Sequence, residues 1–311
     1  MRDGNPRSTM GELVEDYLAE CRSKGLSQKT VNFSYGYPLR KVFVPWCDNH
    51  GFSDPAELNT NDLVVFTNEL RDGGGKRGSL SKHSVWTYVK AVKRFFAWAK
   101  GRDQRVQAEA ELPKLPRKLV EILSRDEIKL LEVKAGNERD ALIVRILADT
   151  GLRVGELINL KIDSVIQRDR AAFLRVQGKG DKERLVPILP SLHRRIKRYA
   201  EGLREMETAS RRLFLSRRRD PTSGDYKALT ESGVQQMVRE VADRARLSKR
   251  IHPHVFRHSA ATFMLQRGMD SVLVAQVLGH ESLQMIQRVY SHLTPLDAHK
   301  ALASALSEDE D

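Results

Sequence analysis

Cysteine is scarce in this sequence and long apolar runs are absent, and both features narrow the class of protein. Among 311 residues there are two cysteines, Cys21 and Cys47, which lie far apart and outside any CxxC pattern. Such spacing argues against a disulfide framework and against a thiolate metal site. No run of about 18 apolar residues offers a membrane span. The start MRDGNPRSTM lacks the apolar segment of a secretory signal, so we expect a cytoplasmic protein with no membrane partner.

Basic residues outnumber acidic ones. The chain has 53 Lys plus Arg against 41 Asp plus Glu, a formal net charge of +12 and a pI near 9.7. A balance of this size is typical of proteins with a polyanionic partner, with nucleic acid ahead of a membrane surface. The basic residues cluster in RRIKR, SRRLFLSRRR and RARLSKR, although each cluster alone is more typical of a solvated face. Composition therefore favours nucleic acid as the partner.

The length predicts roughly two domains, since one domain usually takes about 150 residues. Residues 1–105 predict a domain of four helices, because apolar residues recur at helical spacing between turn signals. The fourth helix also carries basic side chains suited either to DNA phosphates or to a solvated face: Lys82, Lys90, Lys93, Arg94 and Lys100. Residues 106–118 hold two prolines and break the periodicity, which predicts a linker.

Residues 119–311 predict a second domain, mainly helical, with a C-terminal tail. Ser124 and Glu127 form a capping box at the start of its first helix. The stretch AAFLRVQGKGDKERLVPI alternates apolar residues around QGKGDKE and predicts a β-hairpin. After Ser191 the pattern is mostly helical. The expected fold class is therefore mainly α with a small β-hairpin or sheet in the second domain.

An arginine marks the junction of two predicted helices at DTGLRVGEL. Gly151 suits the position just after the first helix, and Arg153 lies where the next helix begins. A cation in a first turn opposes the helix dipole by about a few tenths of a kcal/mol, so its presence suggests that an anion completes the arrangement. Glu156, three residues on, could alternatively pair with Arg153 and make the feature structural.

The stretch RIHPHVFRHSAATFML predicts an amphipathic helix. Its apolar stripe consists of Val255, Phe256, Ala260, Phe263 and Met264. His254 and Arg257, three residues apart, are expected on a different face. Side by side they can grip a phosphate and move a proton, or simply cap and solvate a surface helix. His254 and His258 have the spacing of a zinc pair, but no HExxH pattern and no third ligand accompany them, so no metal is expected.

Three further candidates are weak signals when taken singly. Lys179 lies between glycines at the predicted hairpin tip, where the backbone can approach a ligand, although such lysines are most often solvated. His280 follows Gly279 at a helix end, which is typical of a cation that satisfies the last carbonyls. Tyr290 lies in an amphipathic segment, where a tyrosine more often packs in the core or an interface than acts as a nucleophile.

Five motifs taken together, in order, closely resemble the signature of the tyrosine recombinases, also called the phage integrase family. They are TGLRVGEL, GKGDKER, HPHVFRHSAAT, LGHES and VYSHL. Each motif alone is a weak signal, whereas all five in the family's order and rough spacing are highly specific. The four-helix stretch is similar to the family's core-binding domain, and residues from about 119 onward are similar to its catalytic domain. With the first helix near Met10 there is no room for an arm-binding domain, which favours a simple Xer-like or mobile-element type.

The resemblance implies a site-specific DNA recombinase that cleaves and rejoins DNA through a 3′-phosphotyrosyl intermediate. The reaction that the resemblance implies needs neither a metal nor ATP, so no cofactor is expected. The implied catalytic residues are Arg153, Lys179, His254, Arg257, His280 and Tyr290, with Glu156 in a supporting role.

Each implied role suits the chemistry of its side chain. Arg153 and Arg257 would hold the non-bridging oxygens of the scissile phosphate, since guanidinium forks are always charged. Tyr290 would attack phosphorus in line. Lys179 would protonate the departing 5′ oxygen, and His254 would assist proton transfer at the nucleophile.

The spacing near the C-terminus departs from the family pattern. His280 would hydrogen-bond the phosphate, and Tyr290 follows it by ten residues, against nine in typical members. One extra residue turns a helical side chain by about 100°. We therefore expect the loop after His280 to absorb the difference.

The expected partners are double-stranded DNA recombination sites and further copies of the chain. The resemblance implies a homotetramer on DNA, in which the C-terminal tail packs on a neighbouring subunit; a tail that packs on its own subunit is the alternative. The tail would use an apolar face formed by Leu293, Leu296, Ala301, Leu302 and Leu306.

Four functions remain open within this resemblance. The first is the integrase or transposase of a mobile element, which carries out DNA integration, and the second is Xer-like resolution of chromosome or plasmid dimers. A third, from another class, is an architectural DNA-binding protein that does not cleave. The fourth is a type IB topoisomerase, which would share the chemistry but act on single sites.

Overall fold

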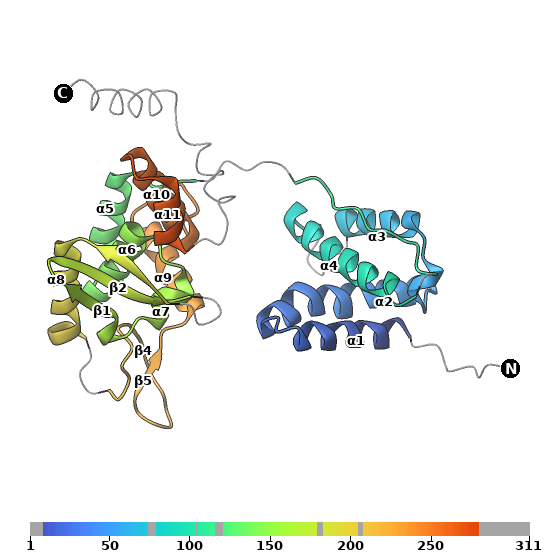
Figure 1. Ribbon diagram of the computed structural model, residues 1–311, viewed down its shortest axis with the longest axis horizontal. Coiled ribbons are helices and arrows are strands. Elements are labelled where there is room, and N and C mark those ends of the chain that lie inside the picture. Colours follow the sequence, from blue (N-terminus) through green and yellow to red (C-terminus); the bar gives the residue numbers. More distant parts are fainter. Residues whose placement is uncertain are drawn as a thin grey trace, which may run out of the picture. The chain divides into compact units, whose positions relative to one another are not determined.

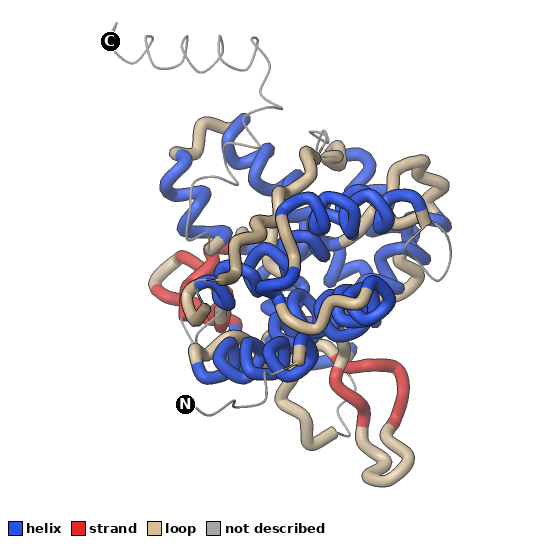
Figure 2. Tube along the Cα trace, turned by 90° about the vertical axis from the view of Figure 1, so that its right-hand side faces the viewer, coloured by secondary structure: helices blue, strands red, loops and turns tan. Residues whose placement is uncertain are grey.

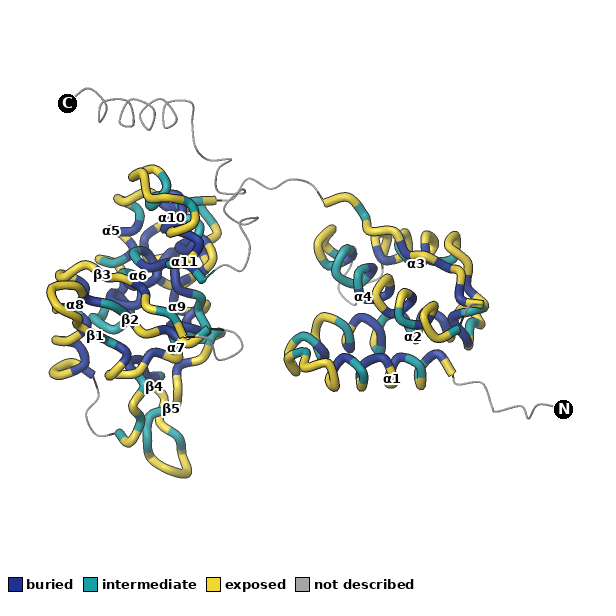
Figure 3. The backbone as a smooth tube through the Cα atoms, viewed as in Figure 1, coloured by how far each residue is buried: buried dark blue, intermediate teal, exposed yellow. Residues whose placement is uncertain are grey.

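The computed structural model describes residues 9–73, 79–103, 105–115, 121–178, 183–204 and 208–279. The chain divides into two compact units, Met1–Lys118 and Leu119–Asp311, each drawn with its own run of elements in Figure 1. Buried residues line the interior of each unit separately (Figure 3). Within the described ranges, no helix combines the length and the apolar character needed to cross a membrane.

The regular elements in the described part of the first unit are all helical, as expected. Its elements are α1 (Met10–Ser23), η1 (Thr30–Gly36), η2 (Leu39–Phe43), α2 (Val44–His50), η3 (Pro55–Glu57), α3 (Thr60–Asp72) and α4 (Lys82–Lys100). The second predicted helix is a continuous helical stretch in which η1 and η2 are π-helical and Pro38 lies between them. Proline has no amide hydrogen for the i→i−4 bond, so a wider winding at this point is physically reasonable.

Aromatic rings fill the interior of the first unit. Phe43 packs edge to face on Phe66, with ring centroids 5.2 Å apart, and on Phe96 at 5.8 Å. Residues 106–110, expected to begin a linker, run in extended form. The side chains of Val106, Ala108 and Ala110 belong to this core, with the intervening residues exposed, as alternation along an extended chain requires.

The second unit combines helices with two small antiparallel sheets, the two places where the described chain forms strands (Figure 2). Its helical elements are α5 (Arg125–Lys134), α6 (Glu138–Thr150), α7 (Val154–Asn159), η4 (Ile162–Ser164), α8 (Pro190–Arg198), η6 (Tyr199–Leu203), α9 (Glu231–Arg244), α10 (Pro253–Gln266) and α11 (Ser271–Leu278). Its strands are β1 (Val165–Arg168), β2 (Ala171–Gln177), β3 (Glu183–Ile188), β4 (Leu215–Arg219) and β5 (Tyr226–Ala228).

The predicted hairpin is present as β2 and β3, with Leu174 opposite Val186 and Val176 opposite Arg184. β1 adds a third strand beside β2, and β4 pairs with β5 in a separate hairpin; neither was predicted. The inward side chains Leu174, Val176 and Val186 are fully buried. The sheet therefore has one face on the core, as its alternating sequence requires.

Helix α6 forms the centre of the second unit, with α5, α8 and α10 packed around it (Figure 1). The predicted capping box starts α5: the N–H of Glu127 donates to Oγ of Ser124, and the N–H of Ser124 donates to Oε2 of Glu127 at 2.7 Å. The predicted glycine end of α6 is also confirmed, because Gly151 has left-handed backbone with φ +62°. The end of α6 at Gly151 places Arg153 directly before α7.

Candidate active site

Arg153 immediately precedes α7 and is held by Glu156 in the first turn. The backbone N–H of Arg153 donates to Oε2 of Glu156 at 2.8 Å, and its Nη1 donates to Oε1 at 2.9 Å. A carboxylate is favourable at a helix start and offsets the unfavourable cation there. The pairing that the sequence left open is therefore present, while the side chain of Arg153 stays 41% exposed.

A second arginine, Arg184 on β3, grips the same carboxylate. Its Nη1 donates to Oε1 of Glu156 at 2.8 Å, and its Nη2 donates to Oε2 at 2.9 Å. Glu156 is buried, and its two oxygens accept bonds from both arginines. Such forked pairs fix the relative position of the two side chains more firmly than a lysine could.

Arg257 on α10 is buried, with 2% of its surface exposed. His254, three residues earlier on the same helix, is exposed and lies close enough for the charge of Arg257 to lower its pKa. Arg257 can be buried because carbonyls at two helix ends, which lack partners within their own helix, accept its hydrogen bonds. Nη1 of Arg257 donates to the Gly151 carbonyl at 2.7 Å, and Nη2 donates to the Leu278 carbonyl at 2.6 Å.

All three arginines meet at the last turn of α11. Nε of Arg184 donates to the Val277 carbonyl at 3.1 Å, and its Nη2 also donates to the carbonyl of Leu278, the residue that Arg257 contacts. Arg153 donates to the next carbonyl, that of Gly279, at 2.8 Å. Cations at a helix C-terminus are favoured by the helix dipole. We call Arg153, Arg184, Arg257 and Glu156 the arginine cluster.

Two glycines allow the helix ends to approach the arginine cluster closely. Gly279 has φ +67°, and a Cβ there would lie 2.7 Å from Cζ of Arg184. Gly151 has φ +62°, and a Cβ there would lie 2.5 Å from Cδ2 of Leu278. Any side chain at either position would meet both unfavourable backbone and a steric overlap.

The charges of the arginine cluster do not cancel. Burial opposes ionisation of Glu156, but hydrogen bonds from Arg184 and Arg153 outweigh it and lower its pKa. Burial and the nearby charge of Arg153 lower the pKa of Arg257 to about 9, so this guanidinium is still charged at neutral pH. Three positive groups and one negative group leave a formal excess of two positive charges.

His254 lies at the exposed start of α10, three residues before Arg257. Partial loss of hydration, together with the charges of Arg257 and Arg153, lowers its pKa. Its imidazole is therefore mostly uncharged at neutral pH and able to accept a proton. No group of three or more potential metal ligands occurs in the described part of the chain.

Three predicted site residues, Lys179, His280 and Tyr290, lie outside the described residues, and so does the predicted C-terminal tail. The described chain ends at Gly279, directly before His280. The structure thus brings together Arg153, Glu156 and Arg257, with His254 close enough for both arginines to lower its pKa.

Sequence reasoning missed Arg184 as part of the site. Arg184 is the last residue of the GKGDKER motif, and this position was the one feature of the sequence that could have indicated a role in the site. Its alternation on β3 predicts only that it faces one side of the sheet. The contacts with Glu156 and α11 depend on how distant segments pack.

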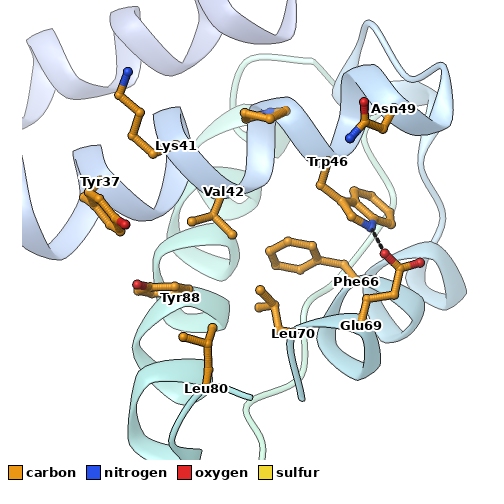
Figure 4. A pocket seen from close by; sticks show the side chains of 11 residues that line it. Tyr37, Lys41, Val42, Trp46, Asn49, Phe66, Glu69, Leu70, Leu80 and Tyr88 are labelled. Carbon is orange, nitrogen blue, oxygen red and sulfur yellow. Dashed lines mark hydrogen bonds between the residues drawn. The ribbon is translucent and has the colours of Figure 1, made fainter. Parts of the chain in front are cut away.

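A cavity of about 310 Å³ lies among the helices of the first unit (Figure 4). Its wall includes Val42, Phe66 and Leu70, and Trp46 donates to Glu69 at 2.9 Å on one side. None of the predicted site residues that the structure describes is among those lining this cavity. The arginine cluster is instead built from hydrogen bonds between helix ends and one strand of the second unit.

Comparison with known proteins identifies the family. Residues 118–296 match the model of the phage integrase family. The tyrosine recombinase XerA of Pyrococcus horikoshii is 32% identical over 295 residues, which covers 94% of this chain and 93% of that protein. The tyrosine recombinase XerD of Listeria monocytogenes is 31% identical over 303 residues, which covers 92% of this chain and 96% of that protein. The chain belongs to the phage integrase family of tyrosine recombinases, a family of enzymes.

Solved structures agree with this family. A crystal structure of XerA recombinase has a TM-score of 0.51 at 30% identity, covering 95% of this chain and 98% of that one. XerH recombinase bound to a palindromic difH substrate has a TM-score of 0.68 at 22% identity, covering 96% and 84%. A lambda integrase tetramer bound to a Holliday junction has a TM-score of 0.69 at 16% identity, covering 91% and 78%. The last two likenesses are of fold, and the expected fold class, mainly α with small sheets, is confirmed.

Proposed function

We propose that the protein is a site-specific DNA recombinase that cleaves and rejoins DNA through a 3′-phosphotyrosyl intermediate. The observation that carries this proposal is the arginine cluster, with its formal excess of two positive charges. A phosphodiester carries one negative charge, and attack by an ionised hydroxyl adds a second in the transition state. Prearranged guanidinium groups stabilise such a charge without reorganisation and without a metal ion.

Arg153 and Arg257 contribute to phosphate binding in different ways in this proposal. Arg153 keeps its side chain 41% exposed and can donate directly to a non-bridging oxygen. Arg257 is buried, and its Nε has no hydrogen-bond partner among the described residues. An unpaired donor in a buried guanidinium is costly, and a bound anion nearby offsets that cost.

The remaining residues supply proton transfer and the nucleophile. Tyr290 attacks phosphorus and conserves the ester bond, and Lys179 protonates the departing 5′ oxygen. His254, uncharged at neutral pH, accepts the proton of the nucleophile. His280 hydrogen-bonds the phosphate, and it directly follows Gly279, whose carbonyl accepts from Arg153.

Both units bind DNA in this proposal. The net charge of the chain is +12, and Lys93 and Arg94 on α4 are exposed. Lys90 on the same helix lies over the ring of Trp86, 4.8 Å from its centroid. Such residues contact phosphates without reading sequence.

Assembly follows the same pattern in this proposal: a homotetramer on two DNA sites, with the C-terminal tail on a neighbouring subunit. Lambda integrase, a structure of the same fold, forms a tetramer on a Holliday junction. Removal of residues 296–311 should therefore impair assembly and strand exchange, while binding to a single DNA site stays intact. Intact strand exchange after this truncation would contradict tail exchange.

Two biological tasks fit this reaction. DNA integration by a mobile element is the first. Similarity to XerA and XerD across more than 90% of the chain supports the second, Xer-like resolution of chromosome or plasmid dimers. An assay with two sites on one circular plasmid, compared with sites on separate molecules, separates the two: resolution favours sites on one molecule, and integration joins separate molecules.

The decisive experiment traps the covalent intermediate. The full-length protein is incubated with suicide duplexes that carry a nick and a randomised surrounding sequence, and adducts that survive denaturation are isolated and sequenced. The wild type should yield adducts, and Tyr290→Phe should yield none. No adduct with wild type would favour an architectural DNA-binding protein, and an adduct with Tyr290→Phe would exclude Tyr290 as nucleophile. Products from paired sites then distinguish a recombinase from a type IB topoisomerase.

A further inference from the structure

Arg184 uses its guanidinium entirely within the protein. It donates to both oxygens of Glu156 and to the carbonyls of Val277 and Leu278, and its side chain is 17% exposed. Arg153, by contrast, is 41% exposed. The geometry of Arg184 therefore suits support of other groups rather than contact with a substrate.

The helix that Arg184 holds is short and buries few apolar side chains among the described residues. α11 has eight residues; its buried side chains Val274, Ala275 and Leu278 form a small cluster with Ala261 of α10, and Val277 packs, partly buried, against the larger core. Val272 and Leu273 of the same helix are 51% and 52% exposed. A short helix with a small apolar contact depends strongly on the hydrogen bonds that fix its end.

The last turn of α11 is also where the two proposed phosphate ligands are anchored. Arg257 shares the Leu278 carbonyl with Arg184, and Arg153 donates to the next carbonyl, that of Gly279. A displacement of this turn would therefore move both guanidinium groups. Through Glu156, Arg184 also fixes the helix start that carries Arg153.

We propose that Arg184 is a positioning residue for strand cleavage, which acts through Glu156 and the end of α11 on the phosphate-binding arginines Arg153 and Arg257. This inference rests on the proposed function. Lysine cannot replace Arg184, because one ammonium cannot bond both oxygens of Glu156 and two carbonyls in the same fixed plane.

The test compares Arg184→Lys with the matched control Arg195→Lys. Arg195 is a similarly buried arginine of the second unit, 21% exposed, which bridges Glu132 and Glu138 and makes no bond to α11. Three quantities are measured on full-length protein: the unfolding midpoint, the affinity for the selected duplex, and the rate of adduct formation at saturating protein. The rate is measured on an ordinary duplex and on one with a 5′-bridging sulfur, whose thiolate leaves without a proton.

We expect Arg184→Lys to lose about 100-fold in saturating rate, the order that a 1 Å misplacement of reacting groups costs. DNA affinity should stay unchanged, Arg195→Lys should cleave as wild type, and the sulfur duplex should show the same loss. The paired change Arg184→Gln with Glu156→Gln removes one positive and one negative group together, so the net charge of the cluster is unchanged, and it should show the loss even if Arg184→Lys folds poorly.

Three results would overturn the inference: cleavage at the wild-type rate by either variant, a loss of affinity that accounts for the loss of rate, or recovery on the sulfur duplex. Recovery on the sulfur duplex would mean that Arg184 supports protonation of the leaving group, the role proposed for Lys179, and does not act through α11. Absence of any wild-type adduct refutes the proposed function itself, whereas a fully active Arg184→Lys beside active wild type refutes only the role of Arg184.

Discussion

Replacement of Glu156 by glutamine tests the electrostatic account of the arginine cluster directly. The Glu156 side chain is 5% exposed, and its carboxylate receives N–H donors from the backbone and side chain of Arg153 and from both Nη atoms of Arg184. Glutamine keeps the shape but places an NH2 group against donors that need an acceptor. Removing one partner of a buried ion pair typically costs about 3–5 kcal/mol. Because Arg153 remains 41% exposed and hydrated, we expect a loss near the lower end, about 3 kcal/mol.

The loss should depend on pH in a defined direction. Burial alone would raise the pKa of Glu156, but its hydrogen bonds to Arg184 and Arg153 lower it below the ordinary value. A carboxyl group with a lowered folded-state pKa contributes its stability fully above the unfolded-state pKa, about 4.3, and loses it as pH falls through the folded value. The difference between wild type and Glu156→Gln should therefore be complete at neutral pH and shrink in acid.

Urea unfolding measures this difference with an internal control. All three tryptophans, Trp46, Trp86 and Trp98, belong to the first unit. Circular dichroism should show an earlier transition for the second unit of the variant, while the tryptophan fluorescence transition should stay in place. A loss below about 1 kcal/mol at neutral pH, the range of an exposed ion pair, would refute the reasoning. So would a loss that persists unchanged in acid.

Three further predictions concern backbone, pH and salt. Gly151→Ala should destabilise the protein by about 2–4 kcal/mol in urea unfolding, because a Cβ would lie 2.5 Å from Leu278 on left-handed backbone. The control Gly25→Ala has left-handed backbone, φ +75°, but nothing within 4 Å of a Cβ, and should cost about 1 kcal/mol in the same assay. The cleavage rate should rise with pH through a midpoint below 6.5, because the pKa of His254 is lowered, and His254→Gln should remove this limb of the pH–rate profile. DNA affinity should fall steeply with salt, with a log–log slope of about −0.9 per neutralised phosphate, and a flat response in a titration of binding against salt would contradict the basic interface.

Local patterns predicted those parts of the fold that local interactions decide. The β2–β3 hairpin followed from alternation over seven and six residues, and the caps at Ser124 and Gly151 followed from single side chains. β1 and β5, with four and three residues, are too short to show a period. The buried alternation of Val106, Ala108 and Ala110 was hidden by the nearby prolines, which indicated a linker.

The site was predictable to the extent that its partners are close in sequence. Glu156 lies three residues from Arg153, so their pairing could be weighed from the sequence. Arg184 bonds to residues 28, 93 and 94 positions away, and such contacts depend on tertiary packing. The burial of Arg257 could not be predicted, because helical periodicity usually sends charged residues to solvent; free carbonyls at two helix ends reverse that preference here.

The two interpretations of Arg153 are compatible. Its ion pair with Glu156 seemed to make an anion unnecessary, yet Glu156 is shared with Arg184 and neutralises only one of two guanidinium groups. A guanidinium has five N–H donors. Those of Arg153 donate to Glu156 and to the Gly279 carbonyl among the described residues, and the side chain remains 41% exposed. The ion pair therefore orients Arg153 and leaves donors and charge for a phosphate, so the structural contact is the means by which the arginine becomes a preorganised ligand.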